Sequence, residues 1–273
     1  MTKKKIGLIA GNGKFPILFA TRAIELGYTV TAVAHKNETL EGLETIVPDL
    51  EWIHVGQINR IIKFFNKRGI TEAALVGGIK KTRMFTDIRP DTKALSLLSS
   101  LKSTHDDGIL RAFADVLEKN GIRITASTFL LPEILAPKGL WTRRKPDKNE
   151  NADIALGWRL AKEIGRLDIG QCVVVAKGSV LAVEAIDGTD ATIQRGGHLG
   201  KGNAVVVKVA KPNQDFRFDI PAVGVETLRN MHAAGCSVLV VEAGNAVTFD
   251  RVEMIREADQ CGMTVLAMTD EDF

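Results

Sequence analysis

In the first half of the chain, short apolar runs alternate with segments in which apolar residues recur at helical spacing. The helical patterns cover residues 15–26, 58–67 and 107–119, and the runs around them are IGLIA, TVTAVAH, AALV and IRITAS. Strands and helices in alternation are typical of a parallel sheet with helices on both faces. We therefore expect an α/β fold that begins with a Rossmann-like domain over residues 1–137.

The second half shows a different order of patterns. A helical pattern over 151–166 is followed by four closely spaced strand-like runs, CVVVAK, SVLAVEAI, NAVVVKVA and FRFDI. Helical patterns near 226–234 and 250–260 then each precede one more apolar run. This order predicts a C-terminal α/β domain with a mixed sheet over residues 151–273. The intervening stretch 138–150 is rich in charge and contains Pro and Gly, which indicates a linker.

Charged and apolar residues alternate in the segment KVAKPNQDFRFDIP, residues 208–221. The alternating charged residues are Asp215, Arg217 and Asp219. In an extended strand they share one face, while the apolar residues between them point into a core. Two carboxylates can hold a divalent metal, and nearby cations can neutralise phosphate oxygens. The alternative is an amphipathic strand whose polar face is simply solvated.

A second segment repeats this mixture of acids and bases. The run 180–185 reads as a strand that ends near Glu184, and the turn signal Asp187-Gly188 follows it. We expect a hairpin that also carries Asp190 and Arg195. Turn chemistry alone explains the Asp-Gly pair, but not the charged residues around it. Two such segments favour a phosphate and metal site more strongly than one.

Glycine loops follow two of the N-terminal strands. Gly11-Asn12-Gly13 opens the first helix, where N–H groups and the helix dipole favour an anion, and Gly77-Gly78 leads to Lys80 at the carboxyl edge of the sheet. A tight turn without a ligand and a plain exit from a strand remain the alternatives. The dinucleotide fingerprint is incomplete, because Pro16 replaces its third small residue and the second strand lacks the acidic residue that holds a ribose. We therefore do not expect NAD.

Three motifs, GLIAGNGKFPILFA, EAIDGTDATIQR and KPNQDFRFDIPAVGVETL, carry a family resemblance. Their order and spacing resemble the metal-dependent UDP-2,3-diacylglucosamine pyrophosphatase family of lipid A biosynthesis, the type unrelated to calcineurin-like phosphoesterases. The resemblance covers essentially the whole chain. It implies a two-domain hydrolase that cleaves the pyrophosphate of UDP-2,3-diacylglucosamine, a lipid-linked sugar nucleotide, to UMP and 2,3-diacylglucosamine 1-phosphate with Mg²⁺ or Mn²⁺.

The motifs and the resemblance together define three sets of expected site residues. The expected catalytic residues are Asp215, Asp219, Arg217 and Gln214. The expected metal ligands are Asp215, Asp219, Glu184 and Asp190. The expected substrate-binding residues are Gly11, Gly13, Gly77, Gly78, Lys80, Thr189, Arg195, Lys208 and Lys211.

Composition and charge narrow the class of protein. A net charge of +3, without basic residues interleaved with aromatics, does not indicate a nucleic-acid-binding protein. Cys172, Cys236 and Cys261 have no metal-type spacing and read as reduced core residues of a cytoplasmic protein. The N-terminus lacks a secretory apolar region, and no window approaches the roughly 20 apolar residues of a membrane span.

We therefore expect a cytoplasmic enzyme with peripheral contact at the inner face of the inner membrane, and leave a homo-oligomer open. The alternative from another class is a nucleotide- or sugar-phosphate-binding regulatory protein without turnover. That protein would need the glycine loops but not the carboxylates of the C-terminal half.

Overall fold

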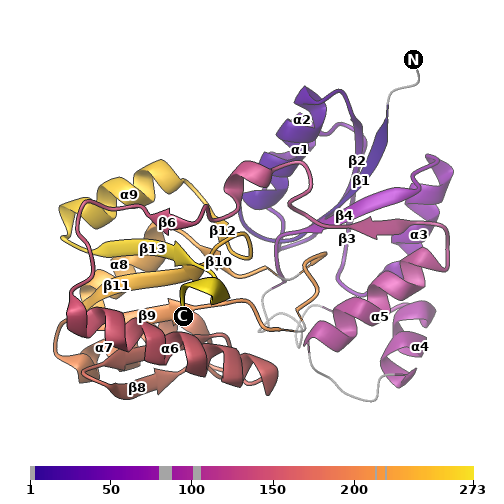
Figure 1. Cartoon of the computed structure of the whole chain (residues 1–273). Helices are drawn as coiled ribbons and strands as arrows, with labels where there is room; N and C mark the ends of the chain where they lie inside the picture. Colours follow the sequence, from indigo (N-terminus) through magenta and orange to yellow (C-terminus); the bar gives the residue numbers. More distant parts are fainter. Residues whose placement is uncertain (1–3, 80–87, 101–105, 213, 219) are drawn as a thin grey trace. The chain divides into compact units, whose positions relative to one another are not determined.

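The computed structural model of the chain describes residues 4–79, 88–100, 106–212, 214–218 and 220–273 (Figure 1). Two compact units make up the chain. Unit 1 comprises Met1–Pro132 together with Asp215–Asp219, and unit 2 comprises Glu133–Gln214 and Ile220–Phe273. Each unit is built around its own sheet, so each has its own core.

Unit 1 contains a five-stranded parallel sheet in the order β3-β2-β1-β4-β5. Its strands are β1 (Lys5–Ala10), β2 (Thr29–His35), β3 (Leu50–Ile53), β4 (Glu72–Val76) and β5 (Arg123–Thr125). Its helices are α1 (Phe15–Glu25), α2 (Leu43–Ile46), α3 (Ile58–Lys67), α4 (Thr92–Ser100) and α5 (Asp106–Glu118). The Rossmann-like parallel sheet predicted from the alternating patterns is confirmed.

The strand order makes β1 the switch point of this sheet. The chain adds β2 and β3 on one side of β1, and then returns to add β4 and β5 on the other side. In open α/β sheets, ligands bind outside the carboxyl ends of the strands at such a point. The carboxyl ends of β1 and β4 are therefore the first place to look for a site in unit 1.

Unit 2 contains a mixed six-stranded sheet in the order β6-β13-β11-β9-β7-β8 (Figure 1). Its strands are β6 (Gly139–Leu140), β7 (Cys172–Ala176), β8 (Ser179–Val183), β9 (Ala204–Lys208), β11 (Cys236–Glu242) and β13 (Thr264–Met268). Its helices are α6 (Lys148–Arg166), α7 (Gly188–Gly200), α8 (Val225–Ala234) and α9 (Arg251–Gln260). A small two-stranded sheet pairs β10 (Ala222–Val223) with β12 (Val247–Thr248).

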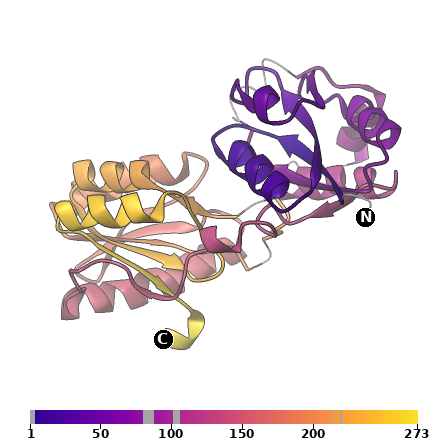
Figure 2. The ribbon, with the colours of Figure 1, turned by 90° about the horizontal axis from the view of Figure 1, so that it is seen from above.

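Helices lie on both faces of the unit 2 sheet (Figure 2), and alternate residues of its strands belong to two different core clusters. Val173 and Val207 pack with Trp158 of α6, whereas Val174 and Val206 pack in a separate cluster with residues of α7, α8 and α9. Because side chains alternate across a strand, a run of apolar residues such as CVVVA is what a sheet covered on both faces requires. The α/β class and the mixed sheet of unit 2 are therefore confirmed.

Two local predictions are wrong. The segment predicted as a hairpin around Asp187-Gly188 is instead the start of α7, so Asp190 and Arg195 lie on a helix. The segment predicted as an alternating strand near residues 214–220 is a turn at 216–218, and Phe216 is exposed. The stretch 138–150 contributes β6, which pairs antiparallel with β13 in unit 2, and its role as a linker stays a prediction.

Candidate functional site

In unit 1, the loops after β1 and β4 lie against each other at the switch point. The N–H of Gly11 donates to the carbonyl of Val76 (2.8 Å), and the N–H of Asn12 donates to that of Gly78 (2.8 Å). A Cβ on Gly11 would lie 2.4 Å from the carbonyl oxygen of Gly78. The structure thus brings Gly11, Gly77 and Gly78 together, with two N–H groups of the first loop used inside the protein.

Gly13 plays a different part in the same loop. Its φ is +81°, which L side chains rarely adopt, and a Cβ there would meet nothing within 4 Å. Gly13 is therefore needed for backbone conformation rather than for close packing. Lys80 lies outside the described residues.

Polar side chains from the end of β2 line the same edge of the unit 1 sheet. The Nδ1 of His35 donates to the carbonyl of Ala10 (2.9 Å), and the hydroxyl of Thr39 donates to the same oxygen (2.7 Å). Burial lowers the pKa of His35 below its ordinary value, so the imidazole is neutral and presents Nε2 as an acceptor. Asn12 donates to the carboxylate of Glu38 (3.4 Å).

The sequence interpretation missed these residues. The available signal was HKNET, a run of polar residues directly after the apolar strand TVTAVA. Three of them, His35, Glu38 and Thr39, bond to the end of β1 or to the first glycine loop as just described. They make this edge a polar wall around the glycine loops.

In unit 2, three charged or polar candidates meet at one edge of the sheet. Cys172 pairs in register with Lys208, and the N–H of Glu184 donates to the carbonyl of Cys172 (2.9 Å). Glu184 and Lys208 are each 8% exposed. Burial raises the pKa of the Cys172 thiol, Glu184 raises it further and Lys208 opposes the rise, so both charges act on the same small region.

Glu184 is held by two donors. Its Oε1 accepts from the hydroxyl of Thr189 (2.8 Å), and its Oε2 accepts from the N–H of Gln171 (3.1 Å). The ammonium of Lys208 donates to the carbonyl of Ala222 (3.0 Å). The structure therefore places the predicted residues Glu184 and Lys208 on either side of Cys172, with Thr189 bonded to Glu184. We call Glu184, Thr189 and Lys208 the Glu184 cluster.

The other predicted cations of unit 2 lie in ion pairs. Arg195 pairs with Asp187 (2.9 Å) and donates to the carbonyl of Val183 (2.9 Å). Lys211 pairs with Asp168 (2.6 Å), and its N–H donates to the side-chain oxygen of Gln214 (2.9 Å). To bind a phosphate, Arg195 or Lys211 has to exchange or share its carboxylate partner.

Glu242 is a buried carboxylate that the sequence interpretation did not single out. It is 6% exposed and ends β11, one residue after Val241, which is the register partner of Lys208. It accepts from the ammonium of Lys162 (2.8 Å), the side-chain amide of Asn245 (2.8 Å) and the N–H of Ala210 (2.9 Å). The sequence signal for this residue is its position, because an acid directly follows the apolar run CSVLVV.

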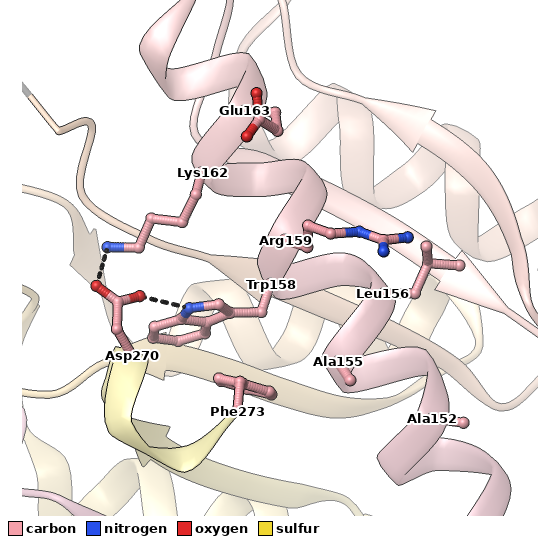
Figure 3. Close-up of a pocket in the computed structure, with 9 residues that line it drawn as sticks. All are labelled: Ala152, Ala155, Leu156, Trp158, Arg159, Lys162, Glu163, Asp270 and Phe273. Carbon is pink, nitrogen blue, oxygen red and sulfur yellow. Dashed lines mark hydrogen bonds and ion pairs between the residues drawn. The ribbon is translucent and has the colours of Figure 1, made fainter.

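A surface groove of about 590 Å³ runs along α6 beside the last turn of the described chain (Figure 3). Trp158 donates from its indole to Asp270 (2.8 Å) and stacks on Phe273, with ring centroids 5.0 Å apart. Lys162 joins this groove to Glu242, because its ammonium contacts both Asp270 (3.7 Å) and Glu242 (2.8 Å). The lining residues do not include any of the predicted site residues that the structure describes.

Two of the predicted catalytic residues belong to unit 1. Asp215 and Arg217 lie in the turn that this unit receives from the later part of the chain, and they bind each other (2.8 Å). Asp219 lies outside the described residues.

The predicted metal ligands only partly fit a metal centre. Glu184 and Asp190 are hard oxygen donors of the type that Mg²⁺ prefers, and both act on the Cys172 thiol. Asp215 belongs to the other unit and has both carboxylate oxygens bonded to Arg217. Within the described ranges, no group of three or more His, Cys, Asp or Glu residues is arranged to hold a metal ion.

Comparisons with known proteins identify relatives over the full length. Residues 5–134 match the model of the LpxI N-terminal domain, and residues 137–266 match that of the LpxI C-terminal domain. The chain is 33% identical over 280 residues to the UDP-2,3-diacylglucosamine pyrophosphatase LpxI of Caulobacter vibrioides, covering 98% of this chain and 99% of that protein.

Among solved structures, a likeness to the biotin carboxylase domain of Hydrogenobacter thermophilus 2-oxoglutarate carboxylase has a TM-score of 0.26 and 16% identity. It covers 66% of this chain and 36% of that one, and it carries no argument. Among the helices that the structure describes, none has the length and apolar character that crossing a membrane requires.

Proposed function

The chain belongs to the LpxI family, and we propose that it hydrolyses the pyrophosphate bond of UDP-2,3-diacylglucosamine to UMP and 2,3-diacylglucosamine 1-phosphate in lipid A biosynthesis. The observation that carries this proposal is the match of both domain models in order, together with 33% identity to a named pyrophosphatase over 98% of the chain. A relative that is similar over both complete domains favours a shared reaction more than a shared fold alone does.

The C-terminal domain of residues 151–273 is the proposed catalytic domain, and the Glu184 cluster is its proposed centre. Hydrolysis requires a base for the attacking water and positive charge near the phosphoryl oxygens. A buried carboxylate with a hydroxyl donor, Glu184 with Thr189, supports the first role. Lys208 beside it supports the second, because a charge acts more strongly where water is excluded.

The glycine loops of unit 1 are the proposed binding place for part of the nucleotide. What supports this role is their position at the switch point of a parallel sheet and their close backbone packing. Lys80, which follows the second loop in the sequence, is proposed to contact a phosphate there.

A divalent metal is also proposed. When bound, Mg²⁺ or Mn²⁺ would supply charge neutralisation for the diphosphate. The proposed ligands are Glu184 and Asp190, with Asp215 and Asp219 as the further candidates from the sequence. Gln214 is proposed to orient water or a phosphate oxygen. We also propose that the protein is cytoplasmic, with peripheral membrane contact.

The proposal is tested by incubating the purified protein with UDP-2,3-diacylglucosamine in detergent micelles and measuring UMP. UMP formation with Mg²⁺ that stops in EDTA and returns with added Mg²⁺ or Mn²⁺ supports both the reaction and the metal. UMP formation that persists in EDTA supports the reaction and removes the metal.

Two variants give the same assay a site control. Glu184→Gln keeps the shape of the buried side chain but removes the base, so we expect turnover to fall by about two decades or more. Glu163→Gln changes an exposed acid on α6 and is expected to leave turnover unchanged. Substrate binding without UMP under every metal condition would instead favour the non-catalytic binding protein.

A further inference from the structure

The turn at residues 215–218 is fastened to unit 1 although the chain on both sides of it belongs to unit 2. The turn is closed on itself, because the N–H of Phe218 donates to the carbonyl of Asp215 (3.2 Å) and the N–H of Arg217 donates to the Asp215 carboxylate (3.1 Å). The sequence predicts catalytic residues within and directly after this turn, so what holds it affects the proposed reaction.

Arg217 makes the polar part of the attachment. Its Nε and one terminal nitrogen donate to the two carboxylate oxygens of Asp215 (3.0 and 2.8 Å). Its other terminal nitrogen donates to Glu118 at the end of α5 (2.9 Å). A guanidinium shared in this way between two carboxylates has a fixed orientation, because both contacts use its planar set of donors.

Phe218 makes the apolar part. It packs against the core cluster of unit 1, as Phe113 and Val116 of α5 also do. The Arg217 guanidinium lies over the Phe218 ring, 5.0 Å from its centroid. Phe216, by contrast, is 37% exposed. The turn is thus attached through one partly buried ring and one ion-pair network.

The charges around Arg217 are unfavourable for a second, phosphate ligand. Asp215, Glu118 and Asp115 all raise the pKa of Arg217, so three acids act on one cation. Arg111, whose Nε lies 3.9 Å from Asp215, is the neighbouring cation on α5. The negative charge of these carboxylates would repel a diphosphate that approached the Arg217 guanidinium.

We infer that Arg217 is a positioning residue that fastens the turn 215–218 to Glu118 of α5, in place of the phosphate contact expected from the sequence. This inference rests on the proposed function for its effect on turnover, but the attachment itself does not. Glu118 then becomes a residue that acts on the proposed site without belonging to it.

Trypsin tests the attachment without any assay of turnover, because it cleaves after Arg217 once the turn opens. Glu118→Gln removes one ion-pair partner and is expected to speed this cleavage about threefold, as loss of an exposed charge pair does. Phe218→Ala is expected to speed it about tenfold, since the contact of the partly buried ring with the core is lost. The matched control is Glu72→Gln, which breaks a similar exposed pair with Arg123 (2.8 Å) elsewhere in unit 1.

Turnover distinguishes positioning from contact. If Arg217 acts by its ion pair with Glu118, the Glu118→Gln variant has a severalfold lower kcat with little change in KM. The single variant Arg217→Glu then loses activity, and the double variant Arg217→Glu with Glu118→Arg recovers it. If Arg217 binds phosphate, the exchanged pair stays as inactive as Arg217→Glu, and the inference is overturned.

Cleavage at Arg217 that is equal in the wild type, Glu118→Gln and Phe218→Ala proteins would also overturn it. The two proposals fail separately. If the protein makes no UMP, the proposed function is wrong. If trypsin then still cleaves the Glu118→Gln variant faster than the Glu72→Gln variant, the attachment of the turn to α5 is supported all the same.

Discussion

Individual glycines in the unit 1 loops have different physical reasons to be glycine. A Cβ on Gly11 would come within 2.4 Å of a backbone oxygen, whereas a Cβ on Gly78 would meet the Asn12 side chain at an ordinary 3.6 Å. Gly78 also has no left-handed φ that would strain a side chain. Substituting Gly11 therefore tests backbone packing, whereas substituting Gly78 tests ligand binding.

We predict that Gly11→Ala destabilises the protein by about 2 kcal/mol or more, because the backbone must move to relieve the contact. Gly78→Ala should leave the unfolding free energy within about 0.5 kcal/mol of wild type. Chemical denaturation measures both values. If the loops bind the nucleotide, Gly78→Ala should still raise KM, and equal stability of the two variants would contradict the packing argument.

His35 gives unit 1 a pH dependence with a defined sign. Burial holds the folded pKa below the ordinary value of 6.5, so the unfolded chain binds a proton first as the pH falls. Stability from this group is therefore complete above about pH 6.5 and is lost progressively as the pH falls towards the folded pKa.

His35→Gln removes the titration and keeps a donor for the Ala10 carbonyl. We predict that between pH 7.5 and pH 5 the variant loses less unfolding free energy than the wild type, by at most about 1.4 kcal/mol per pH unit for one proton. Denaturant titrations at several pH values measure the difference. Parallel pH profiles for the two proteins would show that His35 does not titrate on unfolding.

Some site residues could be named from the sequence although their local structure could not. Glu184 and Lys208 end apolar strands, and a strand end is recognisable from its run alone. The sequence predicts a hairpin for Asp190 and Arg195 because Asp187-Gly188 reads as a turn. In the structure a Cβ on Gly196 would lie 2.5 Å from Val174, so that glycine allows α7 to pack on the sheet.

At the scale of elements, the turn at 215–218 shows why alternation was misleading. Period-two alternation predicts a strand only if backbone N–H groups remain available for a ladder. Here the Asp215 side chain captures the N–H of Arg217, which is the competition that Asp offers to regular structure. The same alternating pattern fits a turn closed by such a bond and a strand with a solvated polar face, so the sequence pattern does not distinguish them.

The start of α6 is set by a capping box that the sequence interpretation assigned to a linker. Asp147 accepts from the N–H groups of Asn149 and Glu150 (both 2.8 Å), and the Glu150 side chain accepts from the N–H of Asp147 (2.9 Å). Glu150 also pairs with Arg144 (2.7 Å), which ties the preceding segment to the helix. Charge and proline in this stretch thus serve a helix start.

We predict that Asp147→Ala lowers the unfolding free energy by about 1 kcal/mol, because two N–H groups lose their acceptor. Asp147→Ser supplies another capping oxygen and should retain most of the stability. Thermal unfolding followed by circular dichroism compares the two. An alanine variant as stable as the serine variant would mean that the cap contributes nothing measurable.

At the scale of the whole molecule, unit 1 is completed by a segment far along the chain. Residues 5–134 match one domain model, yet unit 1 also includes Asp215–Asp219. Sequence patterns located both sheets but could not reveal this exchange, because a pattern along the chain does not show which sheet a short segment packs against. It follows that a fragment ending at residue 134 lacks a ring that packs against its core.

We predict that a fragment of residues 1–134 is less stable than the same fragment carrying residues 214–220 through a flexible Gly/Ser linker. Partial burial of the Phe218 ring is expected to stabilise the fused fragment by less than the about 1.5–3 kcal/mol of a fully buried side chain, and the partly exposed Arg217–Glu118 pair adds little. The fused fragment with Phe218→Ala is the control and should lose most of the gain. Denaturant unfolding of the three proteins gives the comparison, and equal stability of the fused fragment and its Phe218→Ala variant would show that this ring does not complete the core of unit 1.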